Sequence, residues 1–544
     1  MSKIKIFGLG GLNEDGKNIY IVEVDNDIFV LDCGLKFATE NMYGVDYIIP
    51  DFEYLVQNKK RIRGVFITHG HYENMGAVNE LLTLIPQLKV YATTFTKYML
   101  INDGVSEKNI VEITPHKKIG FKSCSVFPMS ISHSAPDSVM YVINTKDGAI
   151  CYTGDFVIDP LMMGHYSMDI GKYGYIGKQG VLCLLSESIN SEKNGHTAQS
   201  QRLTEYYRDI VNKAPGRIFF SVLPNNIYTI GQIFNSIENT DRKVVAMGKN
   251  LQNIINFAKK ENYLSFSDEI LGDLNNIKDN NTVFLIGDDK EKPYNSVDKI
   301  INGYDKYLSF RKDDTVIFAE PRWDSSEKKL VHIEDEIARM DAKSISLPKD
   351  KTVSLHASKE DLMLMIKLLS PKYYMPVKGE YRYMVENGDI ANSLGVSKDN
   401  IILKQNGDVV EFNNGELVNK FEKIKVNDIL IDGKSNDDIG ELVLKDREML
   451  SENGILLISA TLNKRTKQLL AGPEVTTRGF IYVKDSGDMI SEIKEISKTI
   501  IDRNTFDNYV EYTKIKTEIR EELSKYFYEK TECKPMIIAV IQEI

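Results

Sequence analysis

The chain has 544 residues, of which 42% are hydrophobic and 27% charged, a balance typical of a globular protein with a sizeable core. This excludes wholesale disorder and collagen-like sequence. The net charge of −10, from 68 basic and 78 acidic residues, argues against a polybasic DNA-coating protein, although a local groove can still bind nucleic acid. No apolar run reaches the roughly 20 residues that span a bilayer, and the N-terminal segment has no apolar signal region, so we expect a cytoplasmic protein. The cysteines form no CxxC pair and are expected to be reduced thiols, at Cys33, Cys124, Cys151, Cys183 and Cys533.

At about 150 residues per domain, the length suggests three or four folding units. In residues 1–202, short β-rich runs alternate with turns and with helix-like pieces. This mixture of hairpins and helices favours an α/β sandwich over a doubly wound nucleotide-binding fold. The strand-like runs are IKIFGLGG, NIYIVEVDNDIFVLDCG, RGVFITHGH, KVYATT, SCSVFPMSISH, MYVINT, AICYTGDF and VLCLLSES.

The rest of the chain divides into four segments that differ in their pattern of predicted strands and helices. Residues 203–345 alternate helical and strand-like stretches, which indicates a parallel sheet of their own. Residues 346–430 return to β-rich sequence around the helix KEDLMLMIKLLS, and residues 431–450 are expected to be a linker. Residues 451–544 contain a strand, two long charged helices and a last strand, PMIIAVIQEI, which together predict a small α+β domain.

The sharpest local signal is the stretch Thr-His-Gly-His-Tyr-Glu-Asn at residues 68–74, which follows the apolar strand GVFI and precedes a helix. Two histidines at i and i+2 on an extended segment point the same way, so His69 and His71 can reach one metal ion. The pair alone is a weak signal, because a chance pair on a loop is common.

Two further residues at predicted strand ends strengthen the signal. His133 follows the strand SCSVFPMSI, and Asp155 follows the strand AICYT. Taken singly, His133 would more often be a core or capped histidine and Asp155 a turn residue. The ordered set of His-x-His, His and Asp, each at the end of a strand, instead predicts a metal site at one edge of a sheet.

The order THGH, SHSAPDS, TGDF resembles the metallo-β-lactamase fold. The inserted unit at 203–345, followed by VSLHASKEDLMLMIKLLSPKYYMPVKGEYR, resembles the β-CASP subgroup and, within it, bacterial ribonuclease J. The tail from DGKSNDDIGELVLKDREML onward is similar to that family's linker and C-terminal domain, so the resemblance covers nearly the whole chain. It implies a metallo-β-lactamase αββα sandwich with an inserted β-CASP α/β domain and a small α+β C-terminal domain.

The resemblance also implies chemistry. The family pattern is a two-zinc site that activates water against a phosphodiester, with 5′→3′ exonuclease and endonuclease activities. The motif residues that this chain keeps for the first zinc are His69, His71, His133 and the bridging Asp155.

This chain departs from the family pattern at the second zinc. The family's His-x-His-x-Asp-His has Glu73 and Asn74 at its last two positions, and the histidine of the family's PVHGEYR is Lys378. An ammonium group has only donors, and an amide is a poor zinc ligand beside imidazole. We therefore expect at most one zinc ion, and the chain resembles the paralogue with a degraded catalytic site.

The positions that support catalysis in the family are mixed here. Glu187 replaces the family's acid after the strand VLCLLS, and Ser354 and His356 match the family's Ser-Gly-His loop, which meets RNA near the cleaved bond. Leu355 replaces the glycine of that loop, which restricts the backbone. Tyr228 and Thr229 replace a histidine and an arginine expected near a 5′-phosphate. The resemblance thus offers Asp155, Glu187 and His356 as catalytic candidates, and Ser354 and His356 as RNA contacts.

Three hypotheses follow. The first is an RNA-binding scaffold with weak or absent nuclease activity that pairs with an active ribonuclease J paralogue in RNA maturation and decay, as a homo- or hetero-oligomer, dimer or tetramer. The second is a genuine exo- or endoribonuclease that uses one zinc, with Glu73 and Lys378 as substitutes. The third, a metal-free hydrolase or small-molecule lactamase, is disfavoured because it leaves the β-CASP segment and the tail unexplained.

Overall fold

The computed structural model describes residues 2–39, 42, 44–273, 275, 279–288, 294–322, 326–354, 356–433, 441–480, 487–505 and 510–544. The chain divides into two compact units. The first comprises Met1–Thr39 and Asp46–Gly433, and the second Glu40–Val45 and Lys434–Ile544. Within the described residues, no helix combines the length and the apolar character needed to cross a membrane.

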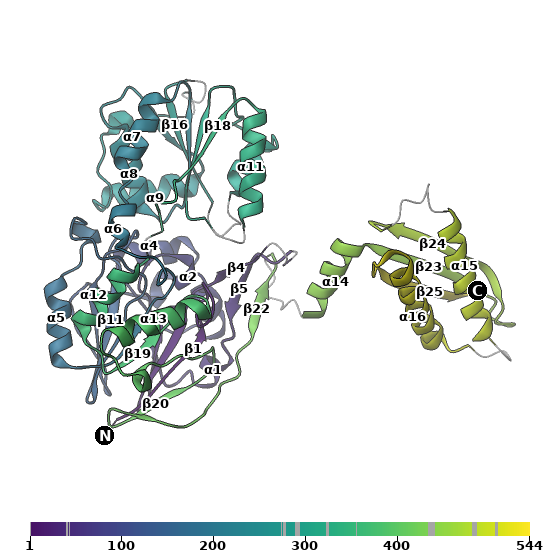
Figure 1. The fold of residues 1–544 in the computed structure, drawn as a ribbon, viewed down its shortest axis with the longest axis horizontal. Helices are drawn as coiled ribbons and strands as arrows, with labels where there is room; N and C mark the ends of the chain where they lie inside the picture. Colours follow the sequence, from purple (N-terminus) through teal and green to yellow (C-terminus); the bar gives the residue numbers. More distant parts are fainter. Residues whose placement is uncertain are drawn as a thin grey trace. The chain divides into compact units, whose positions relative to one another are not determined.

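Two β-sheets pack face to face in the first unit (Figure 1). The first sheet has the strand order β21-β20-β1-β2-β3-β6-β7-β8 and the second the order β19-β13-β12-β11-β10-β9. The strands of the first sheet are β1 (Lys3–Gly10), β2 (Ile19–Val24), β3 (Asp27–Leu31), β6 (Ile62–Phe66), β7 (Val90–Ala92), β8 (Ile110–Glu112), β20 (Val410–Asn413) and β21 (Glu416–Val418). Those of the second are β9 (Ile119–Gly120), β10 (Ser125–Ser130), β11 (Val139–Thr145), β12 (Gly148–Tyr152), β13 (Val181–Ser186) and β19 (Tyr373–Pro376).

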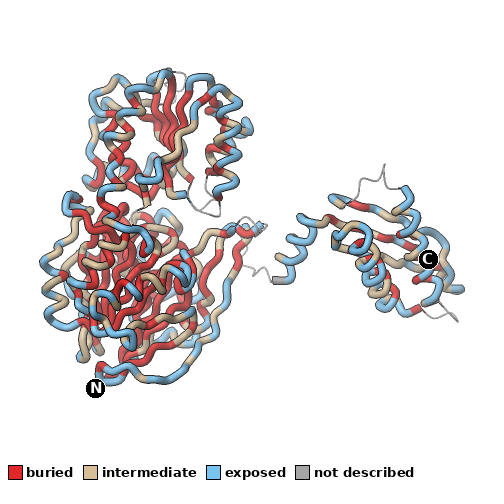
Figure 2. Tube along the Cα trace, viewed as in Figure 1, coloured by how far each residue is buried: buried red, intermediate tan, exposed pale blue. Residues whose placement is uncertain are grey.

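The sandwich has apolar side chains on both faces of both sheets, which explains the nearly continuous apolar runs in its strands. In β2, for example, Tyr20 and Val22 point to the core between the sheets, while Ile19 and Ile21 point to the helices outside. Figure 2 shows this buried interior. The helices of the sandwich are α1 (Glu53–Gln57), α2 (Tyr72–Met75), α3 (Val78–Leu84), α4 (Thr94–Asn102), α5 (Ile170–Gln179), α6 (Thr197–Ser200), α12 (Lys359–Leu369) and α13 (Tyr381–Ser393).

A third sheet, wholly parallel, forms the inserted domain, as the strand–helix rhythm predicts. Its order is β15-β16-β14-β17-β18, and Figure 1 shows α7 and α8 on one side of it and α11 on the other. The strands are β14 (Ile218–Val222), β15 (Lys243–Ala246), β16 (Thr282–Gly287), β17 (Thr315–Ala319) and β18 (Lys343–Ser346). The helices are α7 (Thr204–Lys213), α8 (Ile227–Ile237), α9 (Lys249–Lys260), α10 (Asn295–Ile301) and α11 (Glu327–Arg339). A small sheet in the order β22-β5-β4 pairs β4 (Lys36–Phe37) and β5 (Tyr47–Pro50) with β22 (Asp428–Ile431).

The second unit has a sheet in the order β24-β23-β25 covered on one face by two helices. Alternate residues of β23, from Leu456 to Leu462, pack against Ile493, Ile519 and Phe527 of those helices. The elements are α14 (Glu441–Asn453), β23 (Ile455–Leu462), β24 (Leu469–Arg478), α15 (Gly487–Arg503), α16 (Tyr512–Thr531) and β25 (Met536–Glu543). Helix α14 occupies much of the segment 431–450 that the sequence suggested as a linker.

Helix α13 and strand β24 are among the elements that the sequence analysis did not predict. Helix α13 contains Asn387 and Gly388, which disfavour helices, but both serve tertiary contacts. Asn387 donates hydrogen bonds to the backbone oxygen of Glu187 and to the Ser188 hydroxyl, and a Cβ at Gly388 would lie 3.0 Å from Ile401. Strand β24 contains Pro473, which is tolerated because β24 lies at the edge of its sheet.

Candidate metal centre and its cleft

The first pair of site histidines lies on the loop that leaves β6. Asp32, at the end of β3, accepts hydrogen bonds from the Thr68 backbone N–H at 2.7 Å and from the Thr68 hydroxyl at 3.0 Å. The same hydroxyl lies 2.9 Å from Nδ1 of His69. Since the hydroxyl donates to Asp32, Nδ1–H of His69 donates to the hydroxyl, and Nε2 of His69 is the nitrogen that faces Asp155.

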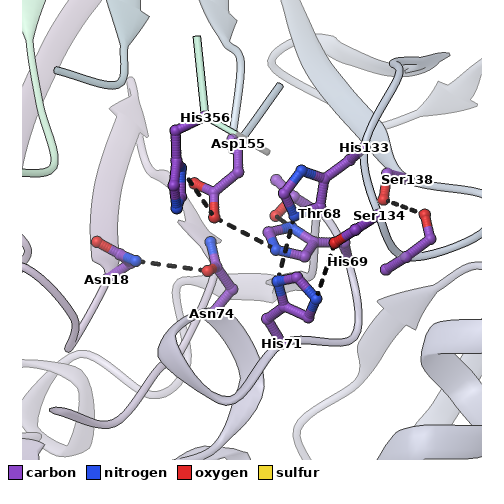
Figure 3. Close-up of polar contacts among 12 residues, drawn as sticks. Asn18, Thr68, His69, His71, Asn74, His133, Ser134, Ser138, Asp155 and His356 are labelled. Carbon is purple, nitrogen blue, oxygen red and sulfur yellow. Dashed lines mark hydrogen bonds and ion pairs between the residues drawn. The ribbon is translucent and has the colours of Figure 1, made fainter. Parts of the chain in front are cut away.

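His133 and Asp155 complete a group of four possible ligands with His69 and His71. One donor atom from each lies within 4.8 Å of the other three. Nε2 of His133 is 3.2 Å from Nδ1 of His71, and Nε2 of His69 is 3.4 Å from Oδ2 of Asp155. Figure 3 shows the three imidazoles and the carboxylate turned toward one another. The structure thus brings together the residues that the sequence placed at separate strand ends.

The charge states of these side chains suit a cation. Burial, together with the neighbouring His69, lowers the pKa of His71 and of His133 well below the ordinary value, so both imidazoles are neutral. Burial raises the pKa of Asp155, but the charges of Lys378 and His356 outweigh it and hold that pKa well below its usual range. Neutral imidazoles and an ionised carboxylate are the forms that ligate metals.

Two buried atoms in the cluster make no hydrogen bond in the described part of the chain, although Nε2 of His69 faces Asp155. These atoms are Nε2 of His69 and Oδ1 of Asp155. Buried polar atoms are nearly always hydrogen-bonded, so such orphans call for an explanation. A cation bound by the four donors would provide it, and imidazole nitrogens with one carboxylate form a set suited to zinc. The residues present therefore fit one metal ion.

Asn74, where the sequence resemblance led us to expect a zinc ligand, is hydrogen-bonded to other side chains. Its Nδ2 donates to Oδ2 of Asp32 at 2.7 Å, and its Oδ1 accepts from Nδ2 of Asn18 at 3.4 Å. The side chain is completely buried, and Figure 3 shows it beside Asn18. The amide thus links α2 to the end of β3, and both its oxygen and its nitrogen are hydrogen-bonded.

Lys378 lies where the sequence resemblance led us to expect another zinc-binding histidine. Its Nζ is 2.5 Å from Oδ2 of Asp155, and only 3% of the residue is exposed. The residue has a positive φ of 52° and is held by backbone hydrogen bonds to Gly11 and Ser188. Burial lowers the pKa of the ammonium, but Asp155 and three other carboxylates outweigh it and raise that pKa, so Lys378 is charged. A fixed cation therefore contacts the carboxylate of Asp155, which is also a candidate metal ligand.

The remaining catalytic candidates form a pair beside this centre. Nδ1 of His356 lies 2.7 Å from Oε2 of Glu187 and 4.0 Å from Oδ2 of Asp155. Oε1 of Glu187 accepts from the backbone N–H groups of Phe156 and Ala357, which fixes the carboxylate. Burial lowers the pKa of His356, but Glu187 and Asp155 raise it above its ordinary value. Asp155, Glu187 and His356 also form a possible ligand group, but the adjacent Lys378 ammonium opposes a second cation there.

A cavity of about 420 Å³ opens between the sandwich and the inserted domain, directly over the histidines. Its lining includes His71, Glu73, His133, Ser354 and His356 from the sandwich. Burial raises the pKa of Glu73, which the Lys378 charge opposes. The lining also includes positively charged and amide side chains from the surrounding segments: Lys193, Asn225, Asn226, Arg322, Lys349 and Lys351.

Some site positions differ from the sequence expectations. Tyr228 lines a separate hollow of about 480 Å³ with Tyr166, outside the main cavity, and Thr229 is buried in α8. Leu355 lies outside the described residues. Asp32 was missed, although its position directly after a buried strand is the signal that identified Asp155. Asn18 follows no such pattern, because its contact with Asn74 depends on the tertiary fold.

Comparison with known proteins supplies the family. Three family descriptions match: Metallo-beta-lactamase superfamily over residues 12–165, Ribonuclease J, beta-CASP domain over residues 215–355, and Ribonuclease J C-terminal domain over residues 442–544. Ribonuclease J2 of Bacillus subtilis (strain 168) is 37% identical over 549 residues, covering 99% of this chain and 99% of that protein. Ribonuclease J 2 of Staphylococcus saprophyticus is 33% identical, covering 99% of this chain and 98% of that protein. The chain belongs to the ribonuclease J family.

The predicted family and its fold class, a metallo-β-lactamase sandwich with a β-CASP insertion and a C-terminal domain, are thereby confirmed. A solved structure of a protein of unknown function from Enterococcus faecalis V583 shares the fold with a TM-score of 0.54 and 18% identity. It covers 75% of this chain and 100% of its own. Within the ribonuclease J frame, the four-residue cluster lies in the sandwich and the β-CASP domain forms the opposite side of the cavity.

Proposed function

We propose that this ribonuclease J-family chain acts in RNA maturation and decay as an RNA-binding partner subunit of an active homologue, with weak or absent nuclease activity of its own. One observation carries the proposal: the positions that would hold a second metal are used by the protein itself. Asn74 is bound to Asp32, and Lys378 is paired with Asp155. A two-metal clamp on a phosphodiester needs both ions, so this chain lacks half of it.

The proposal includes one zinc ion at most, held by His69, His71, His133 and Asp155. When bound, zinc would supply Lewis-acid polarisation of a phosphodiester oxygen or of water. Support comes from the neutral imidazoles and from the orphaned atoms of His69 and Asp155. The ammonium of Lys378 partly neutralises Asp155 and so reduces the negative charge available to hold a second cation.

RNA binding in the cavity is supported by the lysine and arginine side chains in its lining, which also contains Asp15, Glu73, Asp288 and Glu320. Lysine and arginine side chains neutralise backbone phosphates, and Lys193, Arg322 and Lys349 line the cavity. His356 faces the same space, and its raised pKa, with Glu187 holding Nδ1, makes it a hydrogen-bond donor to an anionic oxygen. Ser354 lines the cavity beside it and is proposed as a further RNA contact.

A second candidate function is an active 5′→3′ exoribonuclease or endoribonuclease that uses one zinc. The intact pair of Glu187 and His356, 2.7 Å apart beside Asp155, favours it, because a protonated imidazole could protonate a leaving oxygen. In this case Lys378 would supply the charge of the missing ion.

The two functions are separated by the decay of 5′-monophosphorylated RNA. We expect the zinc-supplemented chain alone to degrade it slowly or not at all, and to alter the rate or the cleavage pattern when an active ribonuclease J is added. The His69→Ala variant measures contaminating nuclease. Rapid decay by the wild-type chain alone, lost in His69→Ala, would establish the one-zinc enzyme instead.

A further inference from the structure

A short segment of the β-CASP domain reaches across to both histidine loops of the sandwich. The segment is Asn225–Tyr228, which follows β14 and leads into α8. The side chain of Asn225 donates from Nδ2 to the backbone oxygen of Gly70 at 3.2 Å. The backbone N–H of Tyr228 donates to the oxygen of Ser134 at 3.0 Å.

Both acceptors are adjacent to candidate ligands. Gly70 lies between His69 and His71, so the direction of its carbonyl is tied to the orientation of both imidazoles. Ser134 follows His133 directly, and its hydroxyl lies 3.4 Å from Nε2 of His71. A single segment of the inserted domain therefore contacts the backbone of both loops that carry the three histidines.

The same segment also contacts the chain that returns to the sandwich. Asn226 donates from Nδ2 to the backbone oxygen of Val353 at 3.1 Å, three residues before His356. Asn226 also accepts from the Thr229 N–H and so caps the start of α8. Its side chain is thus committed to local structure, whereas Asn225 donates to the histidine loop.

We propose that Asn225 is a positioning residue for the metal centre, so that the β-CASP domain sets the metal affinity of the sandwich through the hydrogen bond from Asn225 to Gly70. The inference rests on the proposed function, because it assumes that the four-residue cluster binds a metal. On this proposal, the metal affinity of the centre depends on both domains rather than on the sandwich alone.

The physical argument is one of orientation. Asn225 is only 5% exposed, and without its donor the Gly70 carbonyl loses the side-chain hydrogen bond that fixes its direction. Loss of groups that orient metal ligands typically lowers metal affinity about 10–100-fold.

The test compares metal binding by the full chain and by Asn225→Leu, which keeps the branched shape of the side chain but removes the donor. Zinc affinity is measured by competition with a chromogenic chelator, and cobalt(II) absorption reports the geometry of the ligands. We expect Asn225→Leu to bind zinc about 10-fold or more weakly and to change the cobalt spectrum. If Asn225→Leu does not fold, Asn225→Ala takes its place with the same expectation.

Asn109 provides a matched control. It is buried like Asn225, 6% exposed, and donates to the backbone oxygens of Pro86 and Leu88 in another part of the sandwich. Asn109→Leu should lower thermal stability while leaving zinc affinity and the cobalt spectrum unchanged.

Two results would overturn the inference: equal zinc affinity in Asn225→Leu and the wild type, or an equal loss in Asn109→Leu, which would indicate general destabilisation. Failure of the wild-type chain to bind any metal would instead overturn the metal part of the proposed function, so the two failures are distinguishable.

Discussion

Lys378 and Asp155 form a buried ion pair, with Nζ of the lysine 2.5 Å from Oδ2 of the carboxylate and neither residue more than 3% exposed. The pair lies beside three histidines, and its carboxylate, Asp155, is one of the four candidate metal ligands. A cation of fixed position, carried by the chain itself, thus contacts Asp155. The consequences of this pair can be measured on stability, on metal content and on activity.

Removing the ammonium should destabilise the metal-free protein. In Lys378→Met, Asp155 is left as a buried charge without its main partner, and breaking such a pair costs about 3–5 kcal/mol. The free energy of unfolding from denaturant titration measures the loss. Lys372→Met is the control, because Lys372 pairs with Glu416 at the surface, where solvent screening leaves an ion pair little effect on stability. Equal small losses in both variants would show that the buried pair is not formed.

Restoring the family ligands should restore catalysis only when all of them return. We expect Glu73→Asp, Asn74→His and Lys378→His together to add a second metal and to raise nuclease activity on 5′-monophosphorylated RNA. Single changes should do little, because a metal site needs its full ligand set. Asn74→His alone, for example, would lose the amide hydrogen bond to Asp32 without completing a ligand set.

The informative failure is a triple variant that binds two metals and stays inert. Ligand loss alone would then not explain weak activity. The substitution at Leu355 in the RNA-contact loop would be the next position to test, by Leu355→Gly in the same background.

Glu320 predicts a pH dependence of stability in the β-CASP domain. It follows β17, accepts a hydrogen bond from Ser221, and burial raises its pKa from 4.5 to about 8, with the charge of Asp288 adding to the effect. Between these values the folded state binds more protons than the unfolded state, so stability falls as pH rises from about 4.5 to 8. Glu320→Gln, which mimics the neutral acid, should therefore raise the free energy of unfolding by about 2–3 kcal/mol at pH 7 and by almost nothing at pH 4.5.

Denaturant titrations at pH 4.5, 6 and 7 check this, with Glu205→Gln as a control because the Glu205 side chain is 81% exposed. A gain in Glu320→Gln that is the same at every pH would contradict the raised pKa.

Assembly is expected to depend on the C-terminal unit. The face of its sheet opposite α15 and α16 carries apolar side chains, with Leu470 57% and Ile538 40% exposed. We expect the full-length chain to be at least dimeric, and deletion of the residues after Gly433 to leave a folded, zinc-competent monomer. Light scattering on both proteins decides the matter; a monomeric full-length chain or an oligomeric truncated one would refute it.

Much of the fold follows from periodicity in the sequence. The parallel β-CASP sheet is visible as alternating strands and helices, and each site histidine stands just after an apolar run, so His69, His133 and Asp155 could be expected to meet. Strand β24 and helix α13 could not be predicted, because a proline disfavours a strand and a glycine disfavours a helix. Pro473 is tolerated because β24 lies at the edge of its sheet, and Gly388 packs closely against Ile401.

The candidate ligands of the site were predictable from the sequence, but the contacts that position the site residues were not. Comparison with the family motif identifies Asn74 and Lys378 as departures from it. The comparison does not reveal that the amide would bind Asp32 or that the ammonium would bind Asp155. These contacts join residues 42 and 223 positions apart in the chain. The link from Asn225 to Gly70, 155 positions apart, is equally hidden, since only the packing of two domains creates it.

The number of zinc ions per chain tests the central claim most directly. Elemental analysis of the purified, zinc-dialysed protein should give at most one zinc per chain, because three imidazoles and Asp155 form one ligand set while Asn74 and Lys378 are engaged elsewhere. His69→Ala should lose this zinc, and Asn74→Ala should keep it. Two zinc ions per chain, or loss of zinc in both variants alike, would contradict the account.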